Sequence, residues 1–158
     1  MAAYPNLELT YEYLMSKMNI LRAEIDQPEP RLVKNNLIFY KFSKLICGPF
    51  NTALVTDKGE LLLQGMNDSG QLAMGKELGP MVPFFPEFRK IDNMKVKDVA
   101  LGAASCHILT EDGKMHAVGD NEWGQHGNGT KLQSHVIQEV SCGHKFQSIA
   151  AGAWHVLA

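Results

Sequence analysis

Cysteine is scarce in this chain of 158 residues, and its distribution excludes an architecture held together by disulfides. The three cysteines, Cys47, Cys106 and Cys142, are an odd number with no paired spacing, which is typical of a reducing compartment. We therefore expect the protein in the cytoplasm, with the nucleus as the alternative. No Cys-x-x-Cys motif occurs, and neither Cys106-His107 nor Cys142-Gly143-His144 has the ligand spacing of a zinc site. We expect no bound metal.

Long apolar runs and a strong charge of either sign are also missing. No stretch approaches the roughly 20 apolar residues that span a membrane. The start, Met1-Ala2-Ala3-Tyr4-Pro5, lacks the basic and apolar regions of a signal peptide. The formal net charge is −2, so no broad electrostatic field favours nucleic acid or a membrane surface as a partner.

Signatures of catalysis and of cofactor binding are absent as well. No Gly-x-Ser-x-Gly elbow occurs. The glycine-rich run 124–129 neither follows the order G-x-G-x-x-G nor opens a predicted helix, so it does not indicate a phosphate-binding loop. A Ser/His/Asp site without a signature stays an open alternative. We expect no cofactor and a protein that is not an enzyme.

Glycine is abundant, and its spacing is the most informative pattern in the chain. Two stretches, 48–75 and 102–129, share one register: five glycines, together with Thr56, Asn67 and Gln71, recur 54 positions later as the same residue. A third copy opens at Gly152. Repeats of about 50 residues indicate a propeller or a solenoid, because one unit cannot bury its apolar face alone. The structural repeat positions that we single out are Gly48, Gly59, Gly65, Gly70, Gly102, Gly113, Gly119, Gly124, Gly152 and His155.

Each full copy contains a predicted β-hairpin. The apolar-rich run 53–56 leads through Asp57-Lys58-Gly59 to a second run, and 107–110 leads through Glu111-Asp112-Gly113 in the same way. Such runs on both sides of a glycine turn are typical of antiparallel strands. Glycine supplies the positive φ that a short hairpin loop requires. We predict hairpin turns at 57–59 and 111–113.

The two copies resemble the repeat of the regulator of chromosome condensation family. The best local match is Gly119-Asp120-Asn121-Glu122-Trp123-Gly124-Gln125-His126-Gly127-Asn128-Gly129, and the resemblance covers roughly residues 42–158. It implies a mainly β fold, an incomplete β-propeller of antiparallel four-stranded blades.

The copies also depart from the family pattern. Asn51 and Ser105 stand where the family has a histidine, which His155 keeps. Ala73 replaces a glycine, and His126 replaces a leucine. These departures weaken an inference about a particular partner more than they weaken the fold prediction.

Residues 1–36 precede the repeats and are predicted to hold one helix and a linker. Apolar residues spaced four and three apart form one seam of this helix, with Asn6 as its N-cap and Pro28 after its end. Two interpretations stay open: a helix that packs on its own propeller, and a helix that docks on a partner or forms a short coiled coil. The seam residues are Leu7, Tyr11, Leu14, Met18, Leu21 and Ile25.

Residues 37–158 are the predicted repeat domain, with units near 42–97 and 98–147 and a partial unit at 148–158. The run 37–40 predicts a buried strand of the first blade. The segments 76–97 and 131–147 are predicted to connect one copy to the next, the first as an extended crossing with apolar anchors. We interpret Trp123 and Trp154 as core or rim packing rather than as a platform for stacking.

The resemblance implies a ring of about seven blades, whereas the chain holds two copies and the start of a third. We therefore expect the N-terminal part of a longer protein, a truncated product, or a piece that a partner chain completes. Open strand edges predict that the isolated chain self-associates or unfolds easily.

The function that we expect is a protein–protein interaction scaffold, with another protein as the partner. The alternative, which the founding member of the family implies, is guanine nucleotide exchange on a Ran-like small GTPase.

Overall fold

The structure, a computed structural model, describes residues 37, 40–78 and 81–158. The chain divides into two units, Met1–Asn36 and Leu37–Ala158, and every described residue belongs to the second. The predicted helix at 7–25, with its seam from Leu7 to Ile25, lies outside the described residues and stays a prediction. In the described part of the chain, no helix is long and apolar enough to cross a membrane.

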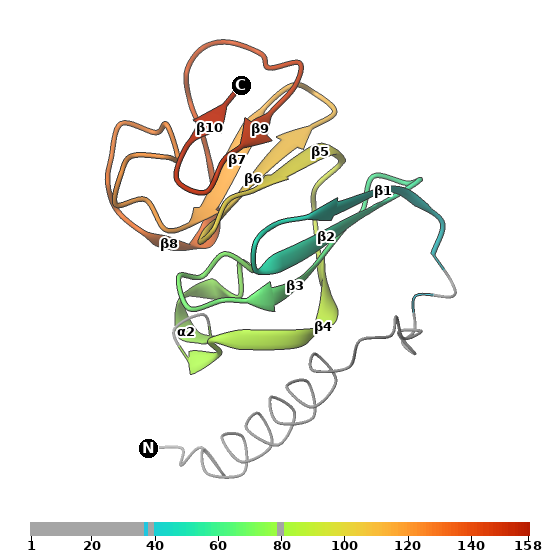
Figure 1. Ribbon diagram of the computed structural model, residues 1–158. Coiled ribbons are helices and arrows are strands. Elements are labelled where there is room, and N and C mark those ends of the chain that lie inside the picture. Colours follow the sequence, from blue (N-terminus) through green and yellow to red (C-terminus); the bar gives the residue numbers. More distant parts are fainter. Residues whose placement is uncertain (1–36, 38–39, 79–80) are drawn as a thin grey trace, which may run out of the picture. The chain divides into compact units, whose positions relative to one another are not determined.

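The first sheet has four antiparallel strands in the order β1-β2-β3-β4 (Figure 1). They are β1 (Phe42–Cys47), β2 (Asn51–Thr56), β3 (Leu61–Met66) and β4 (Phe84–Ile91). The turn between β2 and β3 closes at Gly59, whose N–H donates to the carbonyl of Thr56 over 3.0 Å and whose φ is +73°. Glycine adopts this φ without a steric penalty, so the predicted hairpin forms at 57–59.

The second sheet repeats this design with β5 (Val96–Leu101), β6 (Ser105–Thr110), β7 (Met115–Gly119) and β8 (Ser134–Glu139), in the order β5-β6-β7-β8. Its hairpin closes at Gly113, whose N–H donates to Thr110 over 3.0 Å. A third, two-stranded sheet pairs β9 (Ala150–Ala151) with β10 (Val156–Leu157). The prediction of a mainly β fold with antiparallel four-stranded sheets is confirmed. The described helix α2 (Gly75–Leu78) has four residues.

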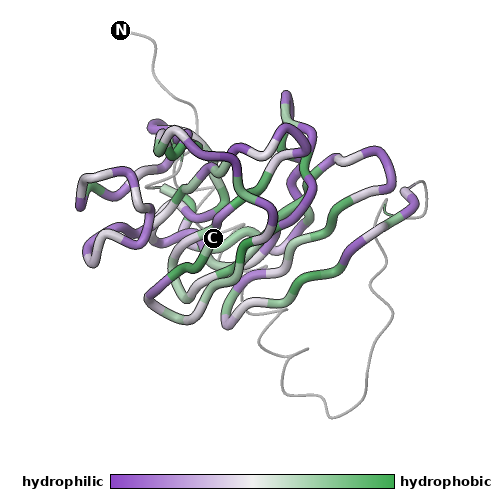
Figure 2. Tube along the Cα trace, turned by 90° about the horizontal axis from the view of Figure 1, so that it is seen from above, coloured by the Kyte–Doolittle hydropathy of each residue, from purple (hydrophilic) through white to green (hydrophobic). Residues whose placement is uncertain are grey.

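The three sheets stand side by side, as blades do, and the core lies between them (Figure 1). One apolar cluster joins β2 and β3 of the first sheet to β5 and β6 of the second, and a smaller one joins β7 to the segment before β9. Figure 2 shows the result along the chain, with apolar residues in the strands and polar residues in the outer loops. The larger cluster contains Ala53, Val55, Leu61, Leu63, Val96, Val99, Leu101, Cys106, Ile108 and Val118.

The two large sheets match in irregularities as well as in strands. A register shift falls between Phe42 and Lys44 in β1 and, 54 positions later, between Val96 and Asp98 in β5. The fourth strands do not keep the spacing of 54 residues. Leu63 and its equivalent Ala117 are 54 positions apart, but their partners in β4 and β8, Arg89 and Gln138, are only 49 positions apart. Counted between equivalent paired positions, Gly65 to Phe85 and Gly119 to Ser134, the path from β7 to β8 is therefore five residues shorter than the path from β3 to β4.

Two details of the sequence prediction were wrong. Leu37 lies in a 3₁₀ turn and Tyr40 lies outside the strands, so the first strand starts at Phe42 rather than at 37. The segments 76–97 and 131–147 are more than connections, because they contain β4 and β8, the fourth strands of the first and second sheets. Pro86 lies in β4 opposite the register shift between Leu63 and Gly65, where a missing N–H costs no ladder bond.

Candidate functional site

Connections from odd-numbered to even-numbered strands gather at one end of the sheets, which we call the loop end. Contacts between neighbouring sheets place them together. A Cβ on Gly48 would lie 2.6 Å from Cβ of Leu101, and one on Gly119 would lie 3.1 Å from Cβ of Gln71. The N–H of Ala103 donates to the carbonyl of Ala153 over 2.9 Å. The loop end comprises residues 48–50, 67–78 with 81–83, 102–104, 120–133 and 152–155.

A buried asparagine organises each of the two long loops. Oδ1 of Asn67 accepts from the N–H of Leu72 over 2.9 Å, and its Nδ2 donates to the carbonyl of Val82 over 2.8 Å. Asn121 does the same in the second loop, accepting from His126 at 2.9 Å and donating to Thr130 at 3.0 Å. Both asparagines are fully buried. Because their amides replace backbone partners, the loops are ordered without regular secondary structure.

Gly65 and Gly119 bring each loop against the turn beside it. Their φ values are +118° and +105°. A Cβ would lie 2.3 Å from the carbonyl oxygen of Phe50 in the first case and 2.4 Å from that of Ala104 in the second. Only glycine fits this backbone approach. The N–H groups of the next residues, Met66 and Asp120, bind these same oxygens at 3.1 and 2.8 Å.

The remaining repeat positions lie in the turns and loops. Gly70 and Gly124 have positive φ in the two long loops, and a Cβ on Gly70 would clash with the ring of His135. Gly48, Gly102 and Gly152 each donate to the carbonyl three residues on, at 2.8, 2.8 and 2.9 Å. The ring of His155 lies against Gly152. These positions build the loop end, and their functional role stays a prediction.

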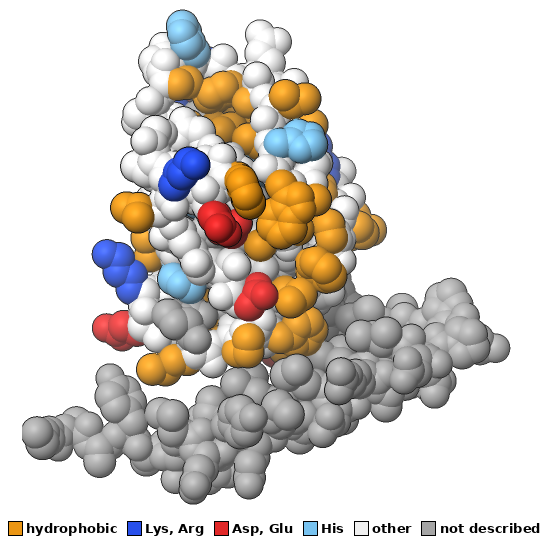
Figure 3. All heavy atoms as spheres, turned by 60° about the vertical axis from the view of Figure 1, so that its left-hand side comes forward, with side chains coloured by type: hydrophobic (Ala, Val, Ile, Leu, Met, Phe, Trp, Pro, Cys, Tyr) orange, Lys and Arg blue, Asp and Glu red, His pale blue; other side chains and the backbone are white. Residues whose placement is uncertain are grey.

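Large apolar side chains are exposed at the loop end. Trp123 is 65% exposed, and Trp154 and Phe50 are each 55% exposed. The tryptophans are therefore not core residues, and packing at the rim, the other half of the interpretation, stays a prediction. Figure 3 shows hydrophobic side chains, with acidic ones beside them, along one face of the molecule. The other exposed apolar residues of the loop end are Leu78, Met81 and Leu132.

The fold does not require these aromatic side chains. Trp123 occupies the position that Ser69 has in the first loop, and the N–H of each donates to a glutamine Oε1 at 3.0 Å, that of Gln125 or Gln71. Phe50 and Trp154 occupy the turn position that Ala104 has in the second sheet. Comparison of the repeats in register was the sequence signal that could have identified them.

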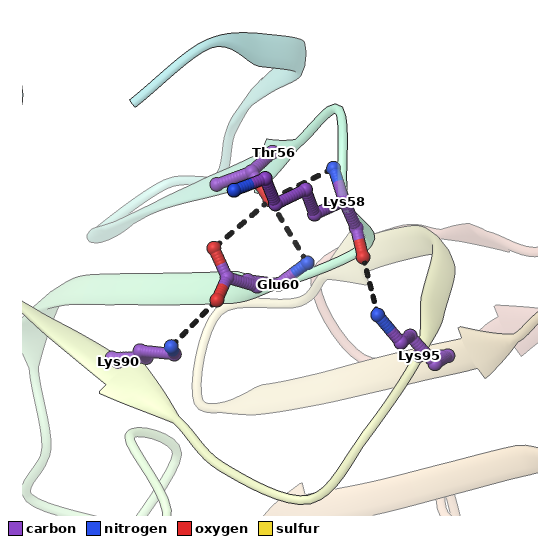
Figure 4. Close-up of polar contacts among 5 residues, drawn as sticks. All are labelled: Thr56, Lys58, Glu60, Lys90 and Lys95. Carbon is purple, nitrogen blue, oxygen red and sulfur yellow. Dashed lines mark hydrogen bonds and ion pairs between the residues drawn. The ribbon is translucent and has the colours of Figure 1, made fainter. Parts of the chain in front are cut away.

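Charges are arranged differently at the opposite end of the sheets, where the hairpins turn. Nζ of Lys90 lies 2.6 Å from Oε1 of Glu60, and Lys95 donates to the carbonyl of Lys58 over 2.9 Å (Figure 4). The Lys90 ammonium lowers the pKa of Glu60. The other ion pairs between described residues are Lys44–Asp98 and Lys114–Glu139, each at 2.9 Å.

In the part of the chain that the structure describes, no lysine or arginine forms an ion pair with a carboxylate of the loop end. Oδ2 of Asp120 accepts from Gln125 Nε2 at 2.8 Å, and Oδ1 accepts from the N–H of Glu122 at 3.1 Å. Asp68 accepts from Nε2 of Gln71 at 3.1 Å. The carboxylate of Glu122 is exposed, and no described residue forms an ion pair or hydrogen bond with it. The loop end is thus apolar, and its carboxylates form no ion pair with any described residue.

Beneath the second loop lie two buried histidines, His107 and His126, whose ring centroids are 6.1 Å apart. Nε2 of His107 is 3.0 Å from the carbonyl oxygen of Gln125. Burial lowers the pKa of His126 to about 4, and the neighbouring His107 acts in the same direction. Burial also lowers the pKa of His107. Residue 126 takes the place of Leu72 in the first loop. Among the described residues, no group of three or more His, Cys, Asp and Glu could hold a metal ion.

Comparisons with known proteins agree with this architecture, although no family model matches the chain. The ultraviolet-B receptor UVR8 of Arabidopsis thaliana is 29% identical over 123 residues, which are 75% of this chain and 27% of the receptor. The secretion-regulating guanine nucleotide exchange factor of Bos taurus is 34% identical over 115 residues, 70% of this chain and 24% of that protein.

A solved structure shows the same fold. The crystal structure of Prp20p from Saccharomyces cerevisiae, described with its binding properties to Gsp1p and histones, superposes with a TM-score of 0.63 at 16% identity. The match covers 80% of this chain and 31% of Prp20p. The chain thus spans about a third or less of the length of each of these proteins.

Proposed function

The chain belongs to the regulator of chromosome condensation repeat family, and from this premise we propose that it is a protein-interaction scaffold that binds another protein through its loop end. The observation that carries the proposal is that Trp123 is exposed although its loop does not need an indole. The equivalent residue of the first blade, Ser69, makes the same backbone hydrogen bond. Exposed aromatic side chains on a rigid frame are typical anchors of protein interfaces.

The two ends of the sheets differ in the way that this function requires. The loop end has six large exposed apolar side chains, among them Trp123, Trp154 and Phe50, whereas the hairpin end has lysine–carboxylate pairs. Paired charges are well solvated and gain little from being covered by a partner. Covering exposed indole and phenyl rings removes apolar surface from water, which favours binding. We therefore propose that the binding surface lies at the loop end.

Photo-crosslinking tests this assignment. A benzoylphenylalanine at position 123 is compared with one at Lys58, an exposed residue of the hairpin end, in cells that express the chain. We expect discrete protein adducts from position 123 and none from position 58. Adducts from position 58 alone, or from neither position, would argue against a scaffold that binds through its loops.

A second part of the proposal concerns completion of the ring. Leu45 of β1 is 67% exposed and Leu157 of β10 is 69% exposed, and both lie outside the loop end. Repeat architectures gain much of their stability from contacts between units. We infer that further blades or a partner chain cover these strands. Light scattering on the purified chain should show self-association that grows with protein concentration, and a compact monomer of 17.5 kDa at every concentration would contradict it.

Guanine nucleotide exchange on a Ran-like small GTPase is the second candidate function. It is favoured by the similarity to the secretion-regulating guanine nucleotide exchange factor and by the shared fold of Prp20p, which is described with its binding to Gsp1p. The test is the release of a fluorescent GDP analogue from a purified Ran-like GTPase. Release that the chain accelerates supports exchange, and an unchanged rate supports the scaffold.

A further inference from the structure

We propose that the loop end accepts a basic peptide segment of its partner, with an arginine side chain lying against the indole of Trp123. The inference rests on the proposed scaffold function and adds the chemistry of the partner. It follows from three features of the second loop: a fixed backbone, an exposed indole and carboxylates with which no cation among the described residues forms an ion pair.

The backbone of the loop is fixed before any partner binds. Asn121 joins the loop to Thr130 at 3.0 Å and to His126 at 2.9 Å, and the N–H of Trp123 is bound by Gln125 at 3.0 Å. The indole therefore projects from an ordered turn. An anchor that is already positioned loses little conformational entropy on binding, which favours affinity.

The electrostatics around the indole select a cation. Glu122 precedes Trp123 and has no partner among the described residues, and Asp120 lies within hydrogen-bond distance of the Glu122 N–H. In the first loop, Asp68 stands at the position of Glu122, so a carboxylate recurs there. By contrast, Glu60 and Glu139 at the hairpin end are paired with Lys90 and Lys114. At the loop end a cation of the partner forms the ion pairs with carboxylates that lysines of the chain form at the hairpin end.

Arginine fits this site better than lysine does. Its planar guanidinium stacks on an indole and still presents N–H groups to carboxylates, whereas an ammonium is more strongly hydrated and has no flat face. The loops contain Lys76 and Lys131, but neither forms an ion pair with a loop carboxylate. Asp120 and Glu122 are therefore available to a cation of the partner.

Trp154 provides the apolar contact for residues beside that arginine. Its turn is joined to Ala103 by the hydrogen bond from the Ala103 N–H to the Ala153 carbonyl, and Ala104 is joined to the Trp123 loop through the N–H of Asp120. The two tryptophans thus belong to adjoining connections. We expect the bound segment to combine arginine with an apolar or aromatic residue.

The test is selection of random 12-residue peptides displayed on phage against the immobilised full chain. Selected peptides are then synthesised and titrated against the wild type and three variants. Trp123→Ser installs the residue of the first blade, Glu122→Gln removes the free charge, and Glu111→Gln, at the hairpin end, is the matched charge control. We expect peptides rich in arginine that bind at least about tenfold more weakly to Trp123→Ser. Glu122→Gln should weaken binding about threefold, and Glu111→Gln should bind like the wild type.

The outcomes separate this inference from the function on which it rests. Acidic or uncharged peptides whose binding Trp123→Ser abolishes would keep the loop end as an interface and overturn the basic partner. Peptides that bind Trp123→Ser as tightly as the wild type would overturn both. Failure to select any peptide would count against an arginine-binding site.

Discussion

The first and second blades are built on one frame, and they differ in what that frame presents to solvent. Asn67 and Asn121 hold their loops through matching hydrogen bonds, and Gly65 and Gly119 pass equally close to a backbone carbonyl. The first loop then carries Ser69, and the second carries Trp123. The comparison separates residues that form the blade from residues that are free to serve a partner.

The interior of the loops differs too. Leu72 fills the first loop, and Arg89 donates to the carbonyl groups of Leu72 and Ala73 at 2.8 Å each. The second loop buries His126 in place of Leu72, and Gln138, the counterpart of Arg89, accepts from Asn128 at 3.1 Å. Equivalent backbones are thus held by different side chains, which makes reciprocal substitutions informative.

The largest effect is expected at the shared glycines. Gly65→Val and Gly119→Val should each destabilise the chain by at least about 2 kcal/mol, because a side chain must adopt positive φ and also meet a carbonyl oxygen. Gly129→Val is the control, since its φ is +75° but no atom lies within 4 Å of its Cβ position, and it should cost about 1 kcal/mol. Urea melts measure all three. Tolerance of valine at one position and not at the other would break the equivalence of the blades.

The buried histidine gives the next largest effect. The pKa of His126 is lowered in the folded chain from 6.5 to about 4, so below pH 6.5 the unfolded chain binds a proton that the folded chain does not. Stability is therefore lost as pH falls from about 6.5 to 4, by up to about 3 kcal/mol. His126→Leu, which copies the first blade, should remove this loss, and Leu72→His should add one.

Thermal melts between pH 8 and pH 4 measure this difference. His107 also has a lowered pKa and contributes a loss of the same sign, so some acid sensitivity remains in His126→Leu. Identical pH profiles for His126→Leu and the wild type would show that residue 126 is not buried as a neutral ring.

A smaller effect is expected where the first blade already tolerates a side chain. Ala73 has φ +55°, and its counterpart Gly127 has φ +67° with Val140 no closer than 3.8 Å to a Cβ. Gly127→Ala should therefore cost no more than about 1 kcal/mol, well below the cost of valine at Gly119. Ala73→Gly should be close to neutral. A loss at Gly127→Ala as large as that at Gly119→Val would mean that the two loops differ in backbone.

The sequence allowed the frame to be predicted because glycines at positive φ and buried asparagines leave a fixed spacing. The hairpins at 57–59 and 111–113 follow from Gly59 and Gly113. The outer strand β4 was missed because Pro86 and alternating charges resemble a connection, and its place is set by pairing with β3. The core half of the interpretation of Trp123 was wrong because tryptophan is highly buried on average. Only the hydrogen bonds of the loop show that it closes without the indole.

The central claim is that the frame is shared and that the indole of Trp123 is not part of it. The most direct test is the free energy of unfolding of Trp123→Ser, measured in the same urea melt as the wild type. We expect the two values to agree within about 0.5 kcal/mol, as for a surface substitution. A loss above about 2 kcal/mol, which is characteristic of a packed aromatic side chain, would contradict the claim.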